Sequence, residues 1–164
     1  MFRYRDAVFE DLPAIVDIYN ATIASRQVTA DLEPVSVASR IGWFQAHAGA
    51  SYPLWVVEAD GGGIGGWLSF SPFHARAAYR HTAEISIYIH ADQRRRGLGG
   101  LLLREAIQRA PSLGFEVLIG LIFGHNQASL DLFAANGFSR WGLLPGVTRL
   151  DGQARDVVIV GRRV

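Results

Sequence analysis

Arginine and glycine are concentrated in one short stretch of the chain. Arg94, Arg95 and Arg96 directly precede Gly97-Leu98-Gly99-Gly100, between an alternating apolar run and a leucine-rich helical pattern. A glycine-rich turn that opens a helix exposes unpaired N–H groups, and the helix dipole adds positive potential at the same place. The stretch is therefore typical of an anion-binding turn between a strand and a helix.

Two common phosphate-binding motifs do not fit this turn. All 16 basic residues are Arg, so a P-loop lysine and lysine-based Schiff-base chemistry are excluded. A dinucleotide fingerprint needs a third glycine where Leu102 stands, and the acidic Glu116 precedes its strand instead of following it. The remaining interpretation is a pyrophosphate on the N–H groups of residues 94–99, beside a strand that is left open.

Composition favours one globular domain over residues 1–164. The chain is 49% hydrophobic and 19% charged, with a net charge of +1. It has no cysteine, and its five histidines show no ligand spacing, so we expect no metal site. A single arginine run without interleaved aromatic residues argues against nucleic-acid binding. The sequence shows neither a signal core nor an apolar run of about 18 residues, so we expect a cytoplasmic protein without membrane contact.

The pattern of apolar residues predicts an α/β fold. Between the strand at 82–90 and the strand at 117–123 lies a helix, which implies a right-handed crossover and a parallel pair in a mostly antiparallel sheet. We expect segment 71–81 to be an irregular loop. The other expected strands are 2–8, 54–59, 64–70, 140–144 and 156–164, and the expected helices, four in all, are 10–25, 35–48, 98–110 and 126–136.

The strand at 82–90 carries one carboxylate on a polar face. Strict alternation places Glu84, Ser86 and Tyr88 on the face opposite to the apolar residues. A partly desolvated carboxylate there would have a raised pKa and could take a proton from an amine. The alternative is an ordinary solvated glutamate on the face of a strand.

The segment "RRRGLG" (94–99) matches the R/Q-x-x-G-x-G/A signature of the GNAT superfamily of N-acetyltransferases. About 27 residues later, "NQASLDLFAANGF" (126–138) resembles that family's N-x-x-A/S-x-x-x-Y/F-x-x-x-G-F element. "DIYNATIASRQVTADLEP", "AYRHTAEISIYI" and "GLLPGVTRLDG" are similar to its phosphinothricin and methionine-sulfoximine acetyltransferase branch. The resemblance implies a GNAT fold with a splayed parallel strand pair, and acetyl-CoA as cosubstrate without a metal.

By this resemblance, Glu84 corresponds to the catalytic base, and the backbone of residues 87–89 holds the pantetheine arm as an added strand. Asn126 has an alternative role as a helix cap, and some of the three arginines are alternatively only solvated. The positions expected to contact acetyl-CoA are Ile87, Tyr88, Ile89, Arg94, Arg95, Arg96, Gly97, Leu98, Gly99, Gly100, Asn126 and Ser129.

One position departs from the family pattern. Phe133 stands where the family has a tyrosine that serves as general acid, and a phenyl ring has no proton to give. Either another group such as Tyr88 or His125 serves, or the thiolate leaves unassisted, since a thiol pKa is near ~8.5.

The expected acceptor is a small amino-acid-like amine such as phosphinothricin, methionine sulfoximine or methionine sulfone. Arg76 and Arg80 approach Glu84 in the sequence, and a planar guanidinium suits a carboxylate or phosphinate. We expect Trp67 and Phe70 to wall the pocket. Alternatives are a protein N-terminus or an aminoglycoside as acceptor, or a non-catalytic acyl-CoA-binding module. The resemblance also implies a homodimer with pockets near the interface.

Overall fold

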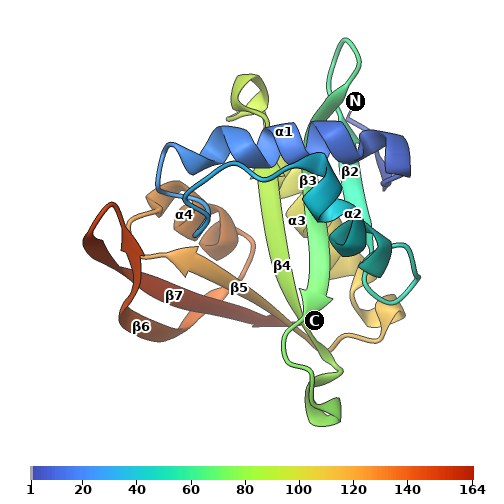
Figure 1. Ribbon diagram of the computed structural model, residues 1–164. Helices are drawn as coiled ribbons and strands as arrows, with labels where there is room; N and C mark the ends of the chain where they lie inside the picture. Colours follow the sequence, from blue (N-terminus) through green and yellow to red (C-terminus); the bar gives the residue numbers. More distant parts are fainter. Residues whose placement is uncertain (1) are drawn as a thin grey trace.

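A seven-stranded mixed sheet in the order β1-β2-β3-β4-β5-β7-β6 carries the fold (Figure 1). The computed structural model describes residues 2–164. All neighbouring strands are antiparallel except β4 and β5, which are parallel as expected. The strands are β1 (Tyr4–Asp6), β2 (Leu54–Glu58), β3 (Ile64–Pro72), β4 (Thr82–Ile89), β5 (Val117–Phe123), β6 (Ser139–Leu150) and β7 (Gln153–Arg163).

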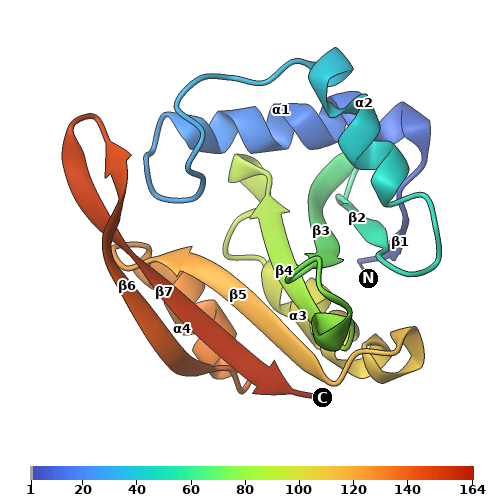
Figure 2. The same cartoon turned by 60° about the horizontal axis from the view of Figure 1, so that its bottom comes forward.

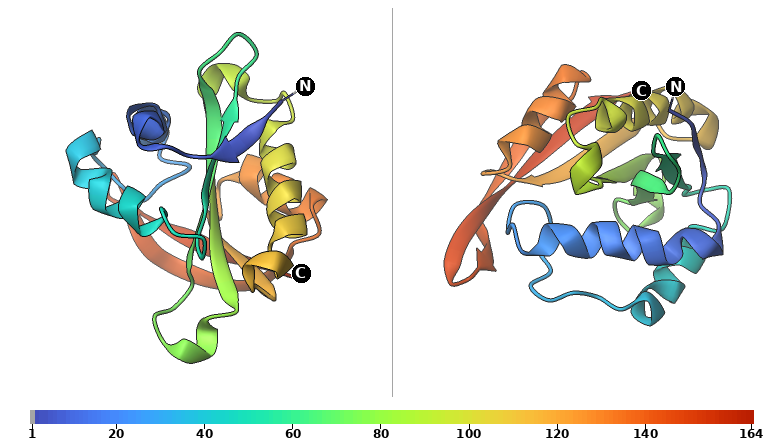
Figure 3. Two further views of the ribbon diagram at one scale, coloured as in Figure 1. Left: turned by 90° about the vertical axis from the view of Figure 1, so that its right-hand side faces the viewer. Right: turned by 90° about the horizontal axis from the view of Figure 1, so that it is seen from above.

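Four α-helices cover the two faces of the sheet. Figure 3 shows α1 and α2 on one side and α3 and α4 on the other. None of the helices within residues 2–164 combines the length and the apolar character needed to span a bilayer. The helices are α1 (Leu12–Ile23), α2 (Val37–Ala46), α3 (Leu98–Arg109) and α4 (Gln127–Ala135), and short 3₁₀ turns occupy Phe9–Asp11, Ala77–Tyr79, Ala91–Gln93 and Pro111–Leu113.

Each face of the sheet has its own apolar cluster. Ile15 of α1 and Phe44 of α2 pack with Trp67 on one face. On the other face, Leu102 of α3 and Phe133 of α4 pack against the opposite side of the strands. β5 contributes Leu118 and Ile122 to this second cluster, whereas Leu121 on its other face is 46% exposed.

The helix ends follow local chemistry. Ser36 caps α2 by accepting a hydrogen bond from the Ser39 N–H at 3.1 Å. Gly137 follows α4 with a φ of 79°, the left-handed conformation that glycine readily adopts after the end of a helix.

The parallel pair separates soon after it forms. β4 follows β3 from Ala83 to Ile89, but its pairing with β5 covers only Thr82, Ala83 and Glu84. Figure 2 shows the two strands close together at one end and diverging toward the other. The expected splay between these strands is therefore confirmed.

Several expected boundaries were wrong. β3 extends to Pro72, into the segment expected to be a loop, and that segment contains the 3₁₀ turn at Ala77–Tyr79. β6 and β7 form a longer hairpin than expected, with β6 continuing past residue 144 to Leu150 and β7 beginning at Gln153. Pro145 is tolerated because the strand register shifts between Leu144 and Thr148, where a proline removes no ladder hydrogen bond.

We predict that Gly120→Ala destabilises the fold. A Cβ at position 120 would lie 2.9 Å from Phe133 Cε1 and 3.0 Å from Val160 Cγ2, between α4 and β7. Overpacking of this kind costs about 1–3 kcal/mol, so thermal unfolding should show a Tm several degrees lower. Gly42→Ala is the control, because its Cβ meets nothing within 4 Å and alanine favours the helix. Equal Tm values for the two variants would contradict the role of Gly120.

Candidate functional site

The splay leaves part of the β4 backbone facing an opening. The His90 N–H donates to the Gly65 carbonyl at 2.9 Å, so even-numbered residues of this segment bond toward β3. Alternation then turns the N–H and C=O groups of Ile87 and Ile89 toward the β5 side. Since the pairing ends at Glu84, no strand within residues 2–164 takes up these groups. An extended ligand with amide groups can add to β4 there like another strand.

The opening forms a groove that α4 closes at its first turn. Asn126 is 6% exposed and caps α4, its Oδ1 accepting from the Ser129 N–H at 3.2 Å. Its Nδ2 donates to Ser129 Oγ at 3.0 Å. Both residues line the groove together with Phe133 and the β4 residues Ser86 and Tyr88. The cap and a contact with a ligand in the groove are therefore compatible.

The turn between β4 and α3 presents N–H groups and positive charge. Gly97 precedes α3 with a φ of 86°, and Arg95 also has a positive φ, of 57°. The first-turn N–H groups of residues 98–100 have no partner inside the helix. All three arginines are exposed, and Arg96 donates to Gln93 Oε1 at 2.8 Å. This geometry suits an anion at the helix N-terminus.

Gly99 also has a packing role. A Cβ at position 99 would lie 3.1 Å from Leu132 Cδ2 of α4. The absence of a side chain therefore lets α3 and α4 approach each other beside the groove.

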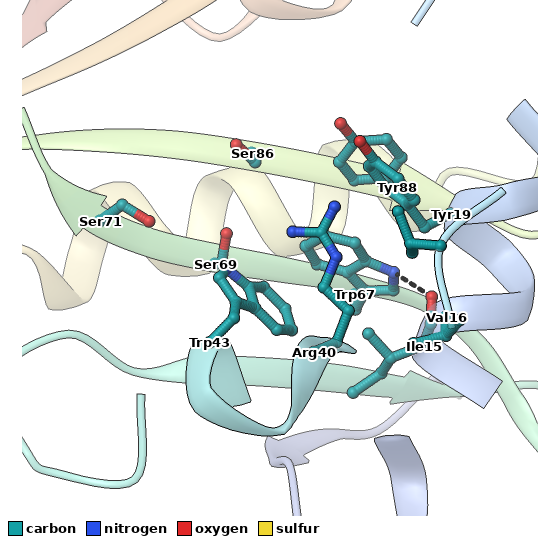
Figure 4. Close-up of a pocket in the computed structure, with 11 residues that line it drawn as sticks. Ile15, Val16, Tyr19, Arg40, Trp43, Trp67, Ser69, Ser71, Ser86 and Tyr88 are labelled. Carbon is teal, nitrogen blue, oxygen red and sulfur yellow. Dashed lines mark hydrogen bonds between the residues drawn. The ribbon is translucent and has the colours of Figure 1, made fainter. Parts of the chain in front are cut away.

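A second cavity, of about 130 Å³, lies on the face covered by α1 and α2 (Figure 4). Trp67 and Tyr88 stack with ring centroids 4.5 Å apart, and Trp43 meets the edge of Trp67 at 5.5 Å. The buried indole N–H of Trp67 donates to the Ile15 carbonyl at 3.1 Å, which fixes the ring. The cavity therefore has rigid aromatic walls, and its size suits a small ligand, since drug-sized sites measure about 300–1,000 Å³.

Polar side chains line the sheet side of this cavity. Ser69 and Ser86 are register partners, as are Ser71 and Glu84. Ser86 and Tyr88 line both this cavity and the groove, so the two spaces meet at β4. Burial raises the pKa of the Glu84 carboxyl above its ordinary value. A half-buried carboxylate therefore lies on the strand face where two ligands could meet, which suits proton removal during group transfer.

The expectation for Phe70 was wrong. Phe70 is 0% exposed and packs in the apolar cluster on the α3 side, with its ring 5.1 Å from that of Trp55. It pairs with Ile85, so it projects from the opposite face of the sheet to Trp67. Trp67 does wall the cavity.

Arg76 and Arg80 are exposed in the loop that joins β3 to β4. This loop leaves the sheet at Pro72 and returns at Thr82, beside the register pair of Ser71 and Glu84. The structure therefore places both arginines outside the two cavities, at the end nearest to Glu84.

Several cavity residues were missing from the sequence interpretation, among them Tyr19, Arg40 and Trp43. Arg40 and Trp43 are spaced i, i+3 on α2, which places them on one helix face. That spacing was visible in the sequence, but the strand face that α2 covers was not.

The two alternative proton donors are poorly suited to that role. His125 Nε2 lies 2.7 Å from the Arg26 carbonyl oxygen, within hydrogen-bond distance. Burial raises the pKa of Tyr88 well above its usual range, which makes the phenol a weaker acid. Phe133 is 4% exposed and packs edge-on against Phe138. Among residues 2–164 there is also no group of three or more His, Cys, Asp or Glu side chains arranged to hold a metal ion.

Comparisons with known proteins agree with this geometry. Residues 15–138 match the model of the Acetyltransferase (GNAT) family. A Bacillus subtilis protein, YwnH, provisionally named a phosphinothricin acetyltransferase, is 49% identical over 98% of each chain. The L-methionine sulfoximine/L-methionine sulfone acetyltransferase of Pseudomonas paraeruginosa is 35% identical over 95% of this chain and 91% of that relative.

The crystal structure of a GNAT superfamily phosphinothricin acetyltransferase from Sinorhizobium meliloti in complex with AcCoA superposes on this chain with a TM-score of 0.94. It is 32% identical and covers 99% of this chain and 88% of the other.

We predict that Glu84→Gln stabilises the protein at neutral pH. Burial raises the pKa of Glu84 in the folded protein, so folding favours the protonated carboxyl over the ionised one. The free energy of unfolding is therefore highest below the pKa that Glu84 has in the unfolded chain, and it falls as the pH rises through the folded-state pKa. The neutral amide avoids this loss, so the variant's Tm should exceed that of the original protein at pH 7 and approach it near about pH 4. Glu116→Gln, at an exposed position, controls for the loss of one negative charge. A Tm difference that does not change with pH would contradict desolvation of Glu84.

Proposed function

The chain belongs to the GNAT family of acetyltransferases, and from this premise we propose that it acetylates a small amino-acid-like amine by direct attack in a ternary complex. It is an acetyl-CoA-dependent N-acetyltransferase. The observation that carries the proposal is the meeting of two cavities at Ser86 and Tyr88 of β4. One is a groove with open backbone groups, and the other is a small aromatic pocket.

The groove and the turn fit acetyl-CoA. The open backbone of Ile87 and Ile89 would hold the pantetheine arm, and Asn126 with Ser129 would contact it from α4. The N–H groups at residues 97–100 and at least one of the three preceding arginines would bind the pyrophosphate. Acetyl-CoA supplies the acetyl group as an activated thioester.

Glu84 is the proposed general base. It lies on the strand face that forms the acceptor cavity, and its raised pKa makes it a better proton acceptor than an ordinary carboxylate. An N–H of the open β4 segment, from Ile89 or its neighbour, would donate to the acetyl carbonyl oxygen and stabilise the charge that develops there. We name no general acid, and the thiolate would leave unassisted.

The proposed acceptor carries an acidic or oxygen-rich group besides its amine. The small cavity and the surrounding arginines support such an acceptor over an aminoglycoside, which is a large polycation. The three relatives described above are named for acetylating phosphinothricin, methionine sulfoximine or methionine sulfone, the Bacillus subtilis protein provisionally. Arg76 and Arg80 would attract the acceptor carboxylate from the loop beside Glu84.

We predict turnover of methionine sulfoximine, methionine sulfone or phosphinothricin, measured as thiol release from acetyl-CoA. Glu84→Gln should lower kcat/KM by about 10²- to 10⁴-fold, because a positioned base contributes that much. The carboxylate is the active form, so kcat/KM should rise as pH passes the raised pKa of Glu84, and the variant should lack this rise.

The matched control for this experiment is Glu116→Gln, which should keep the original rate and pH profile. A fully active Glu84→Gln variant would remove the proposed base. Tight acetyl-CoA binding without turnover of these amines, other amino acids, peptides or an aminoglycoside would favour an acyl-CoA-binding module instead.

We further propose that the protein is a cytoplasmic homodimer. A cysteine-free chain fits a reducing compartment. Trp141, Leu143, Leu144 and Val147 of β6 are all 40% or more exposed and lie within seven residues of one another. Such a patch supports an interface in which two copies present the same surface to each other.

We predict that Val147→Glu converts the dimer to a monomer in sedimentation equilibrium. The change places a charge in the exposed apolar patch, where burial in an interface would be costly. Val8→Glu is the matched control, since Val8 is 50% exposed against 57% for Val147 but lies outside β6. A dimer that persists in the Val147→Glu variant would exclude this surface.

A further inference from the structure

Arg40 extends from the first turn of α2 into the acceptor cavity. Its side chain is 29% exposed, and its guanidinium carbon lies 5.1 Å from the centroid of the Tyr19 ring. One nitrogen, Nη2, donates to Asp31 Oδ2 at 3.1 Å. Asp31 in turn accepts a hydrogen bond from the Tyr19 hydroxyl. The guanidinium is therefore held in place by one carboxylate and one aromatic face.

This anchoring leaves most of the guanidinium donors free for a ligand. Arginine has five N–H donors, and the bond to Asp31 uses one nitrogen. In the described part of the chain, Nε and Nη1 of Arg40 donate to no protein acceptor, and none of the residues that line the cavity is a carboxylate. The cavity lining therefore contains free charged donors and no carboxylate, and the one carboxylate bound to Arg40, that of Asp31, lies outside the lining.

Ser69 supplies a second polar group next to Arg40. The residue is only 2% exposed, and Figure 4 shows its hydroxyl in the same cavity as the Arg40 guanidinium. Within residues 2–164 this hydroxyl makes no hydrogen bond to the protein. A nearly buried hydroxyl that opens on a cavity is suited to bind a ligand oxygen.

The cavity has two chemically different ends. The cavity meets the groove at Ser86 and Tyr88, and the reacting amine must lie near Ser86, on the strand face that also carries Glu84. Arg40 and Tyr19 mark another part of the cavity, against α1 and α2. An acceptor with its amine at Ser86 would therefore direct its remaining atoms toward Arg40.

Resting on the proposed function, we propose that Arg40 is a specificity-determining residue that binds oxygen atoms at the end of the acceptor side chain. The group it selects is a sulfone, sulfoximine, phosphinate or carboxylate, with Ser69 as a second donor. This role differs from that of Arg76 and Arg80, which lie outside the cavity beside Glu84 and would act on the α-carboxylate.

The test compares methionine sulfone with methionine, which share a carbon chain and differ in two oxygens. Arg40→Met keeps an unbranched side chain over Tyr19 but removes the donors. We expect kcat/KM for the sulfone to fall by about 10- to 100-fold, mostly through KM, and kcat/KM for methionine to change by less than about 3-fold. Arg40→Lys should restore part of the loss, because it keeps the charge but not the planar fork.

Two controls separate this role from a structural one. Arg3→Met makes the same substitution at an exposed position and should leave both substrates unaffected. Arg76→Ala should weaken both substrates equally, since both carry the α-carboxylate. Equal losses for sulfone and methionine in Arg40→Met, or a loss in kcat alone, would overturn the proposal.

Binding measured without acetyl-CoA separates failure of this inference from failure of the proposed function. Trp43 and Trp67 line the cavity, so methionine sulfone should quench tryptophan fluorescence, with a Kd raised about 10- to 100-fold in Arg40→Met. If methionine sulfone quenches the fluorescence with the expected rise of Kd in Arg40→Met, but is not acetylated, Arg40 remains an oxygen-binding residue and the proposed acetylation of this amine is rejected. An absence of quenching by the sulfone in the original protein would overturn both.

Discussion

The short pairing of β4 with β5 is the constraint on which the site depends. Three register pairs join these strands at Thr82, Ala83 and Glu84, and beyond them β4 stays with β3 while β5 stays with β7. The divergence leaves backbone donors and acceptors of β4 facing an opening. It also lets the cavity on the α1–α2 face communicate with that opening, so both proposed ligands can reach the same strand.

The fold tolerates the separation of β4 from β5 because the sheet remains stabilised on each side of the opening. Only a few backbone groups lose a strand partner, and they face a groove instead of a sealed core. Apolar clusters pack on both faces of the sheet. The loop after α1 also connects the two parts of the sheet, because Arg26 forms an ion pair with Asp151 at the β6–β7 turn and its carbonyl oxygen contacts His125. The opening is therefore a stable part of the architecture.

Sequence patterns with a fixed period predicted the structure well. Alternation in residues 82–89 gave the two faces of β4, including the face of Glu84, and the continuous apolar run gave the bounds of β5. The same rule could have corrected the error at Phe70, because residues 67 and 70 are an odd number apart and cannot share a strand face. Periodicity could not predict that Arg40 lines the cavity, because its position over the sheet depends on how α2 packs on α1 and β3.

The position of β4 between two separately built spaces has a consequence for how this architecture can change. The acceptor cavity takes its walls from α1, α2 and β3, whereas the groove and the anion-binding turn take theirs from α3, α4 and β5. Of the helices and strands only β4 belongs to both, and the loop between α1 and α2 adds Val35 to the cavity and Val28 to the groove. Substitutions on the first set of elements can therefore retune the choice of amine while the cosubstrate site stays intact, which makes specificity evolvable independently of the chemical step.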